Sequence, residues 1–227
     1  MPDEDSPARL MLEGQAGHVA GLALLLAALH SVSDIAGIKD GEFLGLLSAC
    51  WATAIVLNVV FHQVYVWACW RSELHAHTLS RLFGNSAFLY FTIPFTVFMV
   101  LRVLLAFALG WANRGTLSID PVVGYGVAVV MLFPVVWLAY SIKRYFTFRR
   151  AFGIDHFDAR YRGAELEQRG IFRFIPNAMY TVGFLGVWIP AFLFQSTAAL
   201  VLAAFCHAYI WVHYFCTEKP DMKRIYG

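Results

Sequence analysis

Runs of about 20 apolar residues constrain this chain more than any other feature of its sequence. A helix of that length crosses the hydrocarbon core of a bilayer with every backbone amide bonded internally. The sequence contains six such runs, at residues 17–38, 43–70, 86–111, 120–142, 176–195 and 197–216. They predict an all-α, polytopic membrane bundle of about six transmembrane helices. Five are expected if the first run, which contains His30 and Asp34, stays outside the bilayer.

The composition agrees with an integral, multi-pass membrane protein. Hydrophobic residues make up 59% of the chain and charged residues only 14%, and the mean hydropathy is +0.61, outside the range of ordinary soluble domains. The formal net charge is +2, and no basic run is interleaved with stacking aromatic residues. A nucleic-acid partner is therefore not expected.

The chain is predicted to form one domain. It has no internal repeat, and its only long polar insert covers residues 143–173. We expect a cytoplasmic tail at residues 1–16 followed by a single transmembrane domain at residues 17–227. The last two apolar runs are joined at Gln195-Ser196 by almost no loop, so they should form a tight helical hairpin.

Basic residues predict the orientation, because short loops rich in Lys and Arg stay on the cytoplasmic side. With six spans, 14 of the 17 basic residues fall on the side that holds both termini and the polar insert. They are Arg9, Arg71, Arg81, Lys143, Arg144, Arg149, Arg150, Arg160, Arg162, Arg169, Arg173, Lys219, Lys223 and Arg224. Both termini are therefore expected to be cytoplasmic.

Two polar clusters flank the expected hairpin. Residues 177–180 read Asn-Ala-Met-Tyr, and residues 218–226 read Glu-Lys-Pro, four further residues, then Ile-Tyr. This arrangement resembles the phospholipid (phosphatidylethanolamine) N-methyltransferase family, which carries Asn-Pro-Met-Tyr before such a hairpin and Glu-Glu-Pro, four residues, then Ile-Tyr after it. The chain departs from that pattern at Ala178, in place of a proline, and at Lys219, in place of the second glutamate.

The resemblance implies transfer of a methyl group from S-adenosylmethionine (SAM) to the amine of a membrane lipid headgroup, either phosphatidylethanolamine or its methylated forms. It implies that the hairpin forms the cofactor pocket, with Glu218 binding the cationic amino end of SAM and with Pro176 and Tyr226 nearby. It also implies that Tyr180 and Asn177 face the cofactor or the headgroup as catalytic residues. The alternatives are that Glu218 merely ends a membrane helix and that Tyr180 belongs to the interfacial aromatic belt.

Two further sites are weaker matches to the same family. Asp155 and His156 in the insert are candidate catalytic residues, although a helix cap and a solvated histidine would also account for them. Gly124 and Gly126 resemble a Gly-x-Gly cofactor element, but small residues in membrane helices more often permit close helix packing. Methyl transfer to an amine is a single displacement that needs no metal, so no metal site is expected.

Two other functions remain open. An isoprenylcysteine-carboxyl-type or other lipid or small-molecule methyltransferase would share the architecture, but residues 175–177 read Ile-Pro-Asn where that family has His-Pro-x-Tyr. A haem-binding or purely structural bundle is the alternative of a different class, because His62, His207 and His213 lie within apolar runs. Arg102 also lies within a run and needs a partner from another segment.

Overall fold

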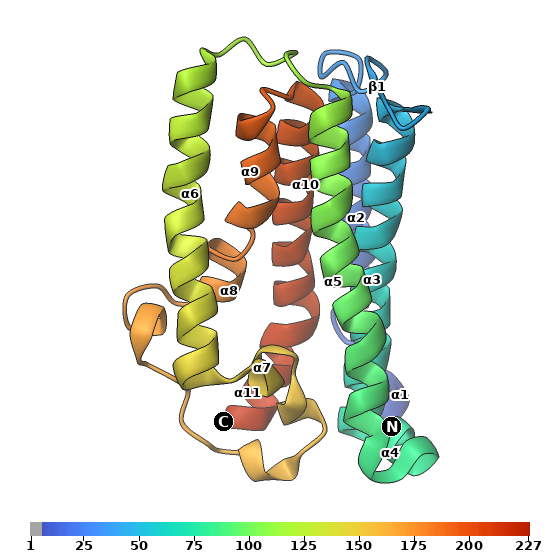
Figure 1. Cartoon of the computed structure of the whole chain (residues 1–227). Coiled ribbons are helices and arrows are strands. Elements are labelled where there is room, and N and C mark those ends of the chain that lie inside the picture. The colour runs from blue at the N-terminus through green and yellow to red at the C-terminus, as the bar shows by residue number, and fades with distance from the viewer. Residues whose placement is uncertain (1–5) are drawn as a thin grey trace.

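The computed structural model describes residues 6–227, and helices traverse its long axis from end to end (Figure 1). The long helices are α2 (Gln15–Val32), α3 (Ser48–Ala76), α5 (Ala87–Ala112), α6 (Pro121–Ser141) and α10 (Thr197–His213). The short helices are α1 (Pro7–Leu12), α4 (Thr78–Phe83), α7 (Phe148–Ala151), α8 (Ala178–Thr181), α9 (Leu185–Leu193) and α11 (Lys219–Tyr226). Within the described residues, the sheet consists of β1 (Glu42–Phe43) paired antiparallel with β2 (Leu46–Leu47).

The predicted all-α membrane bundle is confirmed. Within residues 6–227, five helical stretches are long and apolar enough to cross a membrane. They are Pro7–Val32, Ser48–Ala76, Thr78–Ala112, Pro121–Phe146 and Thr197–Tyr226. Large apolar side chains on their outer faces remain exposed, such as Val130 and Phe133 of α6 at 73% each. Exposed apolar area on that scale is suited to lipid contact rather than to water.

The fifth predicted span is shorter than expected and is broken. It consists of α8 and α9, joined by a turn at residues 182–184, and its apolar stretch is Ala178–Leu193. At about 1.5 Å per residue this stretch covers roughly 24 Å, less than the roughly 30 Å of a hydrocarbon core. Gly183 lies in the turn, where a Cβ atom would collide with the carbonyl oxygen of Met179.

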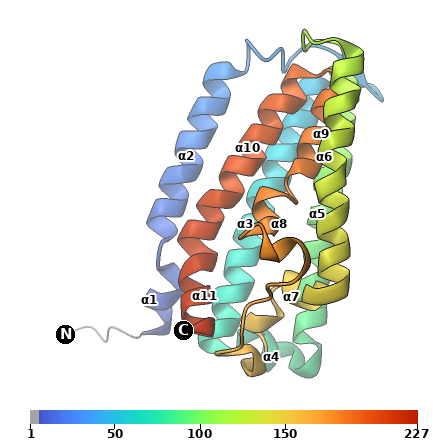
Figure 2. The same cartoon turned by 90° about the vertical axis from the view of Figure 1, so that its left-hand side faces the viewer.

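Small residues bring the central helices close together. The main core joins α2, α3, α5, α9 and α10 and includes the fully buried residues Val59, Leu109, Ala191, Ala198 and Tyr209. A Cβ atom on Gly110 of α5 would lie 2.8 Å from the Phe194 ring, so this glycine permits the contact between α5 and the end of α9. In Figure 2, α2 stands at the outer edge of the bundle beside α10.

One buried asparagine fixes the loops at the end of the bundle opposite the termini. The Asn113 side chain donates to the carbonyl oxygens of Gly37 and Asp40, at 2.9 Å each. Its Oδ1 accepts from the Ser196 hydroxyl at 2.9 Å and from the Ala198 amide at 3.0 Å. Because Asn113 is 1% exposed, these bonds hold the start of α10 against the loop that precedes α3.

The opposite end of the bundle carries α1, α11 and the polar insert (Figure 1). Of the predicted tail at residues 1–16, residues 1–5 lie outside the described residues, and the rest contains α1 and the first residues of α2. The π-helical turns 142–146 and 214–218 end α6 and α10 there. Both turns shift the direction of the side chains that follow them, and such turns recur at functional sites.

Candidate functional site

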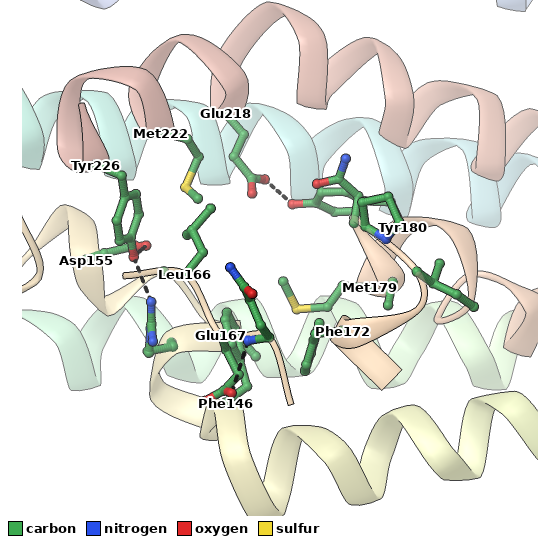
Figure 3. A pocket seen from close by; sticks show the side chains of 18 of the residues that line it. Phe146, Asp155, Leu166, Glu167, Phe172, Met179, Tyr180, Glu218, Met222 and Tyr226 are labelled. Carbon is green, nitrogen blue, oxygen red and sulfur yellow. Dashed lines mark hydrogen bonds between the residues drawn. The ribbon is translucent and has the colours of Figure 1, made fainter. Parts of the chain in front are cut away.

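A pocket of about 460 Å³ lies at the end of the bundle that carries the insert, between the insert, α8 and the turn from α10 to α11 (Figure 3). The pocket brings together seven of the nine residues predicted from the sequence to form the site. These seven are Asp155, His156, Pro176, Asn177, Tyr180, Glu218 and Tyr226. Apolar side chains form much of the remaining wall, among them Phe146, Leu166, Phe172 and Met222.

Tyr180 and Glu218 meet across this pocket. The Tyr180 hydroxyl donates a hydrogen bond to Oε2 of Glu218 (Figure 3). The π-helical turn 214–218 carries Glu218 inward, and Pro220 follows in the first turn of α11, where its missing amide costs nothing. Glu218 is only 8% exposed, so its side chain does not snorkel into water as the alternative interpretation required.

Asn177 and Pro176 form the exposed rim of the pocket. Asn177 adopts a left-handed conformation with φ of 53°, and its side chain makes no capping hydrogen bond. Its carbonyl oxygen instead accepts from the amides of Tyr180 and Thr181, at 2.8 and 3.1 Å. This turn aims α8, and with it the Tyr180 ring, toward Glu218.

A tight glycine turn positions Asp155 and His156. Gly153 has φ of +79°, and a Cβ atom there would lie 2.5 Å from the Trp70 ring, so glycine alone fits. The His156 ring then stacks on Trp70, with ring centroids 4.3 Å apart. Asp155 accepts from His156 Nδ1 at 3.0 Å and from the Tyr226 hydroxyl at 2.7 Å. The insert is thereby tied both to α3 and to the end of α11.

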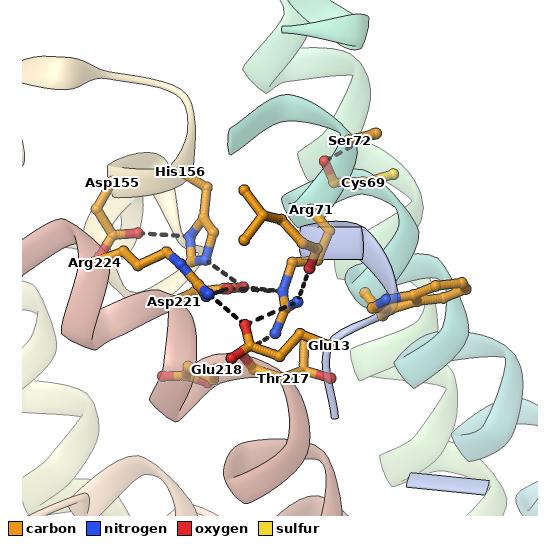
Figure 4. A network of polar contacts seen from close by, with 12 residues as sticks. Glu13, Cys69, Arg71, Ser72, Asp155, His156, Thr217, Glu218, Asp221 and Arg224 are labelled. Carbon is orange, nitrogen blue, oxygen red and sulfur yellow. Dashed lines mark hydrogen bonds and ion pairs between the residues drawn. The ribbon is translucent and has the colours of Figure 1, made fainter. Parts of the chain in front are cut away.

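Behind the pocket lies a buried ion pair that the sequence did not predict (Figure 4). Arg71 and Asp221 are both 0% exposed, and Arg71 Nε donates to Asp221 at 2.8 Å. His156 Nε2 lies 3.6 Å from the same carboxylate, and Arg71 Nη2 donates to the Thr217 carbonyl oxygen at 3.0 Å. No local pattern signals this pair, because Arg71 directly follows the apolar run 43–70 and is expected in a loop, whereas α3 continues through it to Ala76.

The two flanking carboxylates hold His156 in its charged form. Burial alone disfavours the imidazolium, but the hydrogen bond with Asp155 and the nearby Asp221 carboxylate outweigh burial and raise the pKa of His156 to about 9. For Asp155, burial acts to raise the pKa, and the hydrogen bond with His156 outweighs it and lowers the pKa below its usual value. His156 is therefore a cation at neutral pH and cannot accept a proton there.

Because the pKa of His156 is raised on folding, we expect the stability of the folded protein to depend on pH. The folded pKa of about 9 exceeds the ordinary 6.5, so the stabilisation is complete below pH 6.5 and is lost as the pH rises through about 9. We expect the Tm of the detergent-solubilised protein to fall across this window. In His156→Gln the fall should be much shallower, whereas the exposed control His30→Gln should behave like the parent. Equal slopes in the parent and in His156→Gln would contradict the assignment.

Gly124 and Gly126 lie away from the pocket, so their predicted contact with a cofactor finds no support in this geometry. A Cβ atom on Gly124 would lie 2.7 Å from the Phe192 carbonyl oxygen, and none of the described atoms lies within 4 Å of the corresponding position on Gly126. Roughly 30 Å of helix separates Gly124 from Phe146 in the pocket wall. Gly124 serves the close packing of α6 on α9, which was the alternative interpretation.

Of His62, His207 and His213, the first two have partners that argue against a shared haem iron, whereas neither ring nitrogen of the buried His213 has a hydrogen-bond partner among the described residues. His62 Nδ1 contacts Arg102 Nη2 at 2.6 Å, which also identifies the partner of Arg102. His207 Nδ1 accepts from the Trp188 indole at 3.1 Å. Among residues 6–227, no group of three or more His, Cys, Asp or Glu side chains could hold a metal ion.

The region that forms most of the pocket is similar to proteins of known family. Residues 119–227 match the family model described as phospholipid methyltransferase. A phosphatidylethanolamine N-methyltransferase of Scheffersomyces stipitis is 34% identical over 108 residues, which cover 47% of this chain and 12% of the relative. A protein of the same name from Botryotinia fuckeliana is 27% identical over 117 residues, covering 52% of this chain and 11% of the relative.

These relatives are much longer than the chain, which spans only about a tenth of their length. No solved structure matches the chain significantly. The matched region contains α6, the insert, the hairpin of α8, α9 and α10, and α11, and so it supplies every wall of the pocket except Trp70. Residues 119–227, just under half of the chain, are therefore similar to the phospholipid methyltransferase family.

Proposed function

We propose that the protein is a SAM-dependent methyltransferase that methylates the amine of a lipid headgroup, with phosphatidylethanolamine and its partly methylated forms as acceptors. The observation that carries this proposal is the buried Glu218 carboxylate, bonded to Tyr180 inside a pocket built almost entirely by the family-matched region. The names of the relatives support the choice of acceptor.

The pocket fits the chemical groups of SAM. Its volume of about 460 Å³ lies within the range of small-molecule sites. The Glu218 carboxylate complements a cationic amino group, and Arg150 and Arg173 in the lining offer cations for the carboxylate of an amino-acid moiety. Phe146 and Phe172 provide apolar walls against which a flat ring system can pack. When bound, SAM supplies an electrophilic methyl group on a sulfonium that leaves as a neutral thioether.

The residues of the chain then position reactants rather than form covalent bonds with them. Glu218 binds the cationic end of the methyl donor, and the Tyr180 hydroxyl fixes the orientation of that carboxylate. The apolar lining excludes water from the amine and so favours its neutral, nucleophilic form. Because His156 is held as a cation, we assign it and Asp155 to positioning the insert and not to removing the amine proton.

The pocket is proposed to face the cytoplasm. Both termini, the insert and 14 of the 17 basic residues belong to the pocket end of the bundle. SAM is a cytosolic metabolite, so a pocket for it must open on that side. We further propose that residues 17–227 act as a single transmembrane domain, with residues 1–16 as the cytoplasmic segment before it.

The proposal is tested with purified protein reconstituted into liposomes that contain phosphatidylethanolamine. Incubation with methyl-labelled SAM should place label in the lipid fraction, as mono-, di- or trimethylated headgroups resolved by chromatography. Liposomes of phosphatidylcholine alone, whose amine is already fully methylated, serve as the control and should stay unlabelled. Absence of label from phosphatidylethanolamine, with SAM binding intact, would contradict the proposed acceptor.

A further inference from the structure

A second cavity adjoins the candidate cofactor pocket. Its volume is about 270 Å³, and it lies between α3, α5, α6, the α8–α9 segment and α10. Trp70, Ala151, Met179 and Tyr180 line both cavities, so these residues form the boundary between them. A molecule in the second cavity would therefore meet the first at Tyr180.

The second cavity opens toward the region occupied by lipid. Met99 and Val103 of α5 line it and are 38% and 40% exposed. Leu138 and Ile142 form the facing wall at the end of α6. Both α5 and α6 pack on α9, which lies between them (Figure 1). An acyl chain can thus leave the cavity laterally between α5 and α6.

Arg102 is the unusual member of this apolar wall. It lies within α5, is 6% exposed, and places its guanidinium 5.2 Å from the centroid of the Phe184 ring. No Asp or Glu side chain lines the cavity, and within residues 6–227 no ion pair involves Arg102. A buried cation without an anion is strongly unfavourable in a membrane helix.

The contact between Arg102 and His62 leaves two donors unused. A guanidinium has no acceptor, so Nδ1 of His62 accepts from Arg102, and Nε2 of that imidazole carries its hydrogen. This Nε2 and the Nε of Arg102 are both buried, and neither has a hydrogen-bond partner among the described residues. A cation with two free N–H donors beside an apolar cavity matches a small oxyanion.

We propose that Arg102, supported by His62, binds the phosphate of the acceptor lipid. The inference rests on the proposed function and deepens it, because it makes the acceptor a phosphate-bearing amine lipid. The headgroup amine then points along the cavity to the boundary at Tyr180, and the acyl chains pass between α5 and α6. Phe184, which contacts the guanidinium, and Tyr180 both line this cavity, so the phosphate and the amine of one headgroup can share it.

The test compares two acceptors in phosphatidylcholine vesicles with the full chain. One is phosphatidylethanolamine, and the other is sphingosine, a long-chain amine without phosphate. In Arg102→Met, the KM for phosphatidylethanolamine should rise about 10-fold to 100-fold, as expected for loss of a charged hydrogen bond. Transfer to sphingosine should stay at the parent level, and Arg102→Lys should be affected less. The exposed control Arg114→Met should match the parent on both acceptors.

Three readouts keep the result interpretable. Thermal stabilisation by SAM reports that each variant is folded. If Arg102→Met does not fold, the two acceptors are compared in His62→Gln and in Arg102→Lys instead. Binding of phosphatidylethanolamine labelled on an acyl chain, measured without SAM, tests the phosphate contact separately from catalysis. A parent protein that binds this lipid but methylates neither acceptor would overturn the proposed function alone. An unchanged KM, or equal losses on both acceptors, would overturn the phosphate site.

Discussion

Glu218→Gln is expected to lower methyl transfer by about 100-fold or more, the range seen when an active site loses one key electrostatic contact. The amide keeps the size of the side chain and can still accept from Tyr180, but it removes the negative charge that Glu218 offers to a cationic ligand. Initial rates with labelled SAM, together with calorimetric SAM binding, measure the effect. Both the affinity for SAM and the rate should fall.

Two variants calibrate that result. Glu165→Gln removes an exposed carboxylate of the insert that does not line the pocket and should retain the parent rate. Tyr180→Phe keeps the ring but loses the hydroxyl that orients Glu218. Its rate of methyl transfer should therefore lie between those of Glu218→Gln and Glu165→Gln. If Glu218→Gln bound SAM and transferred methyl groups like the parent, the pocket assignment would be wrong.

Arg71→Met is expected to lower the free energy of unfolding by about 3–5 kcal/mol, the usual effect of breaking a buried ion pair. The substitution leaves the buried Asp221 with only the longer contacts to His156 at 3.6 Å and Arg224 at 3.8 Å, and it removes a donor from the Thr217 carbonyl oxygen. Reversible unfolding in mixed micelles measures the loss. Because Asp221 also faces His156, the insert should loosen and SAM binding should weaken with it.

The control for this prediction is Arg224→Met. Arg224 pairs with Glu13 at 2.5 Å, but its side chain is 33% exposed and Glu13 is 44% exposed, so the loss should be at most about 1 kcal/mol. The double variant Arg71→Met with Asp221→Leu should recover part of the stability, because no unpaired charge then remains buried. If Arg71→Met were as stable as the parent, the ion pair between Arg71 and Asp221 would contribute little to stability.

The membrane architecture could be predicted because it depends on the length of apolar runs. α3, α5, α6 and α10 overlap the expected spans closely, since each run is long and has few charges. The break between α8 and α9 could not be predicted in this way. Hydropathy averages over residues 176–195, whereas the break depends on Gly183, whose Cβ position is blocked by the carbonyl oxygen of Met179.

The sequence could bring together those pocket residues that flank a single helical hairpin. Tyr180 and Glu218 meet because α9 and α10 are joined by a minimal turn, which returns the chain to the same end of the bundle. Asp221 escaped prediction because its partner Arg71 is 150 residues away in sequence, and no local pattern links the two. Gly124 and Gly126 differ, since this short motif lies far along α6 from the pocket and neither residue lines it.

The sequence distance between Arg71 and Asp221 also bears on biogenesis. Arg71 belongs to α3, which is synthesised early, whereas its carboxylate partner arrives with α11 after every long helix has been made. During co-translational insertion the arginine must therefore stay hydrated or bind a lipid phosphate until α11 docks. The pocket then closes only after α11 has docked, and a nascent chain that stalls before α11 should be selectively recognised by membrane quality-control proteases.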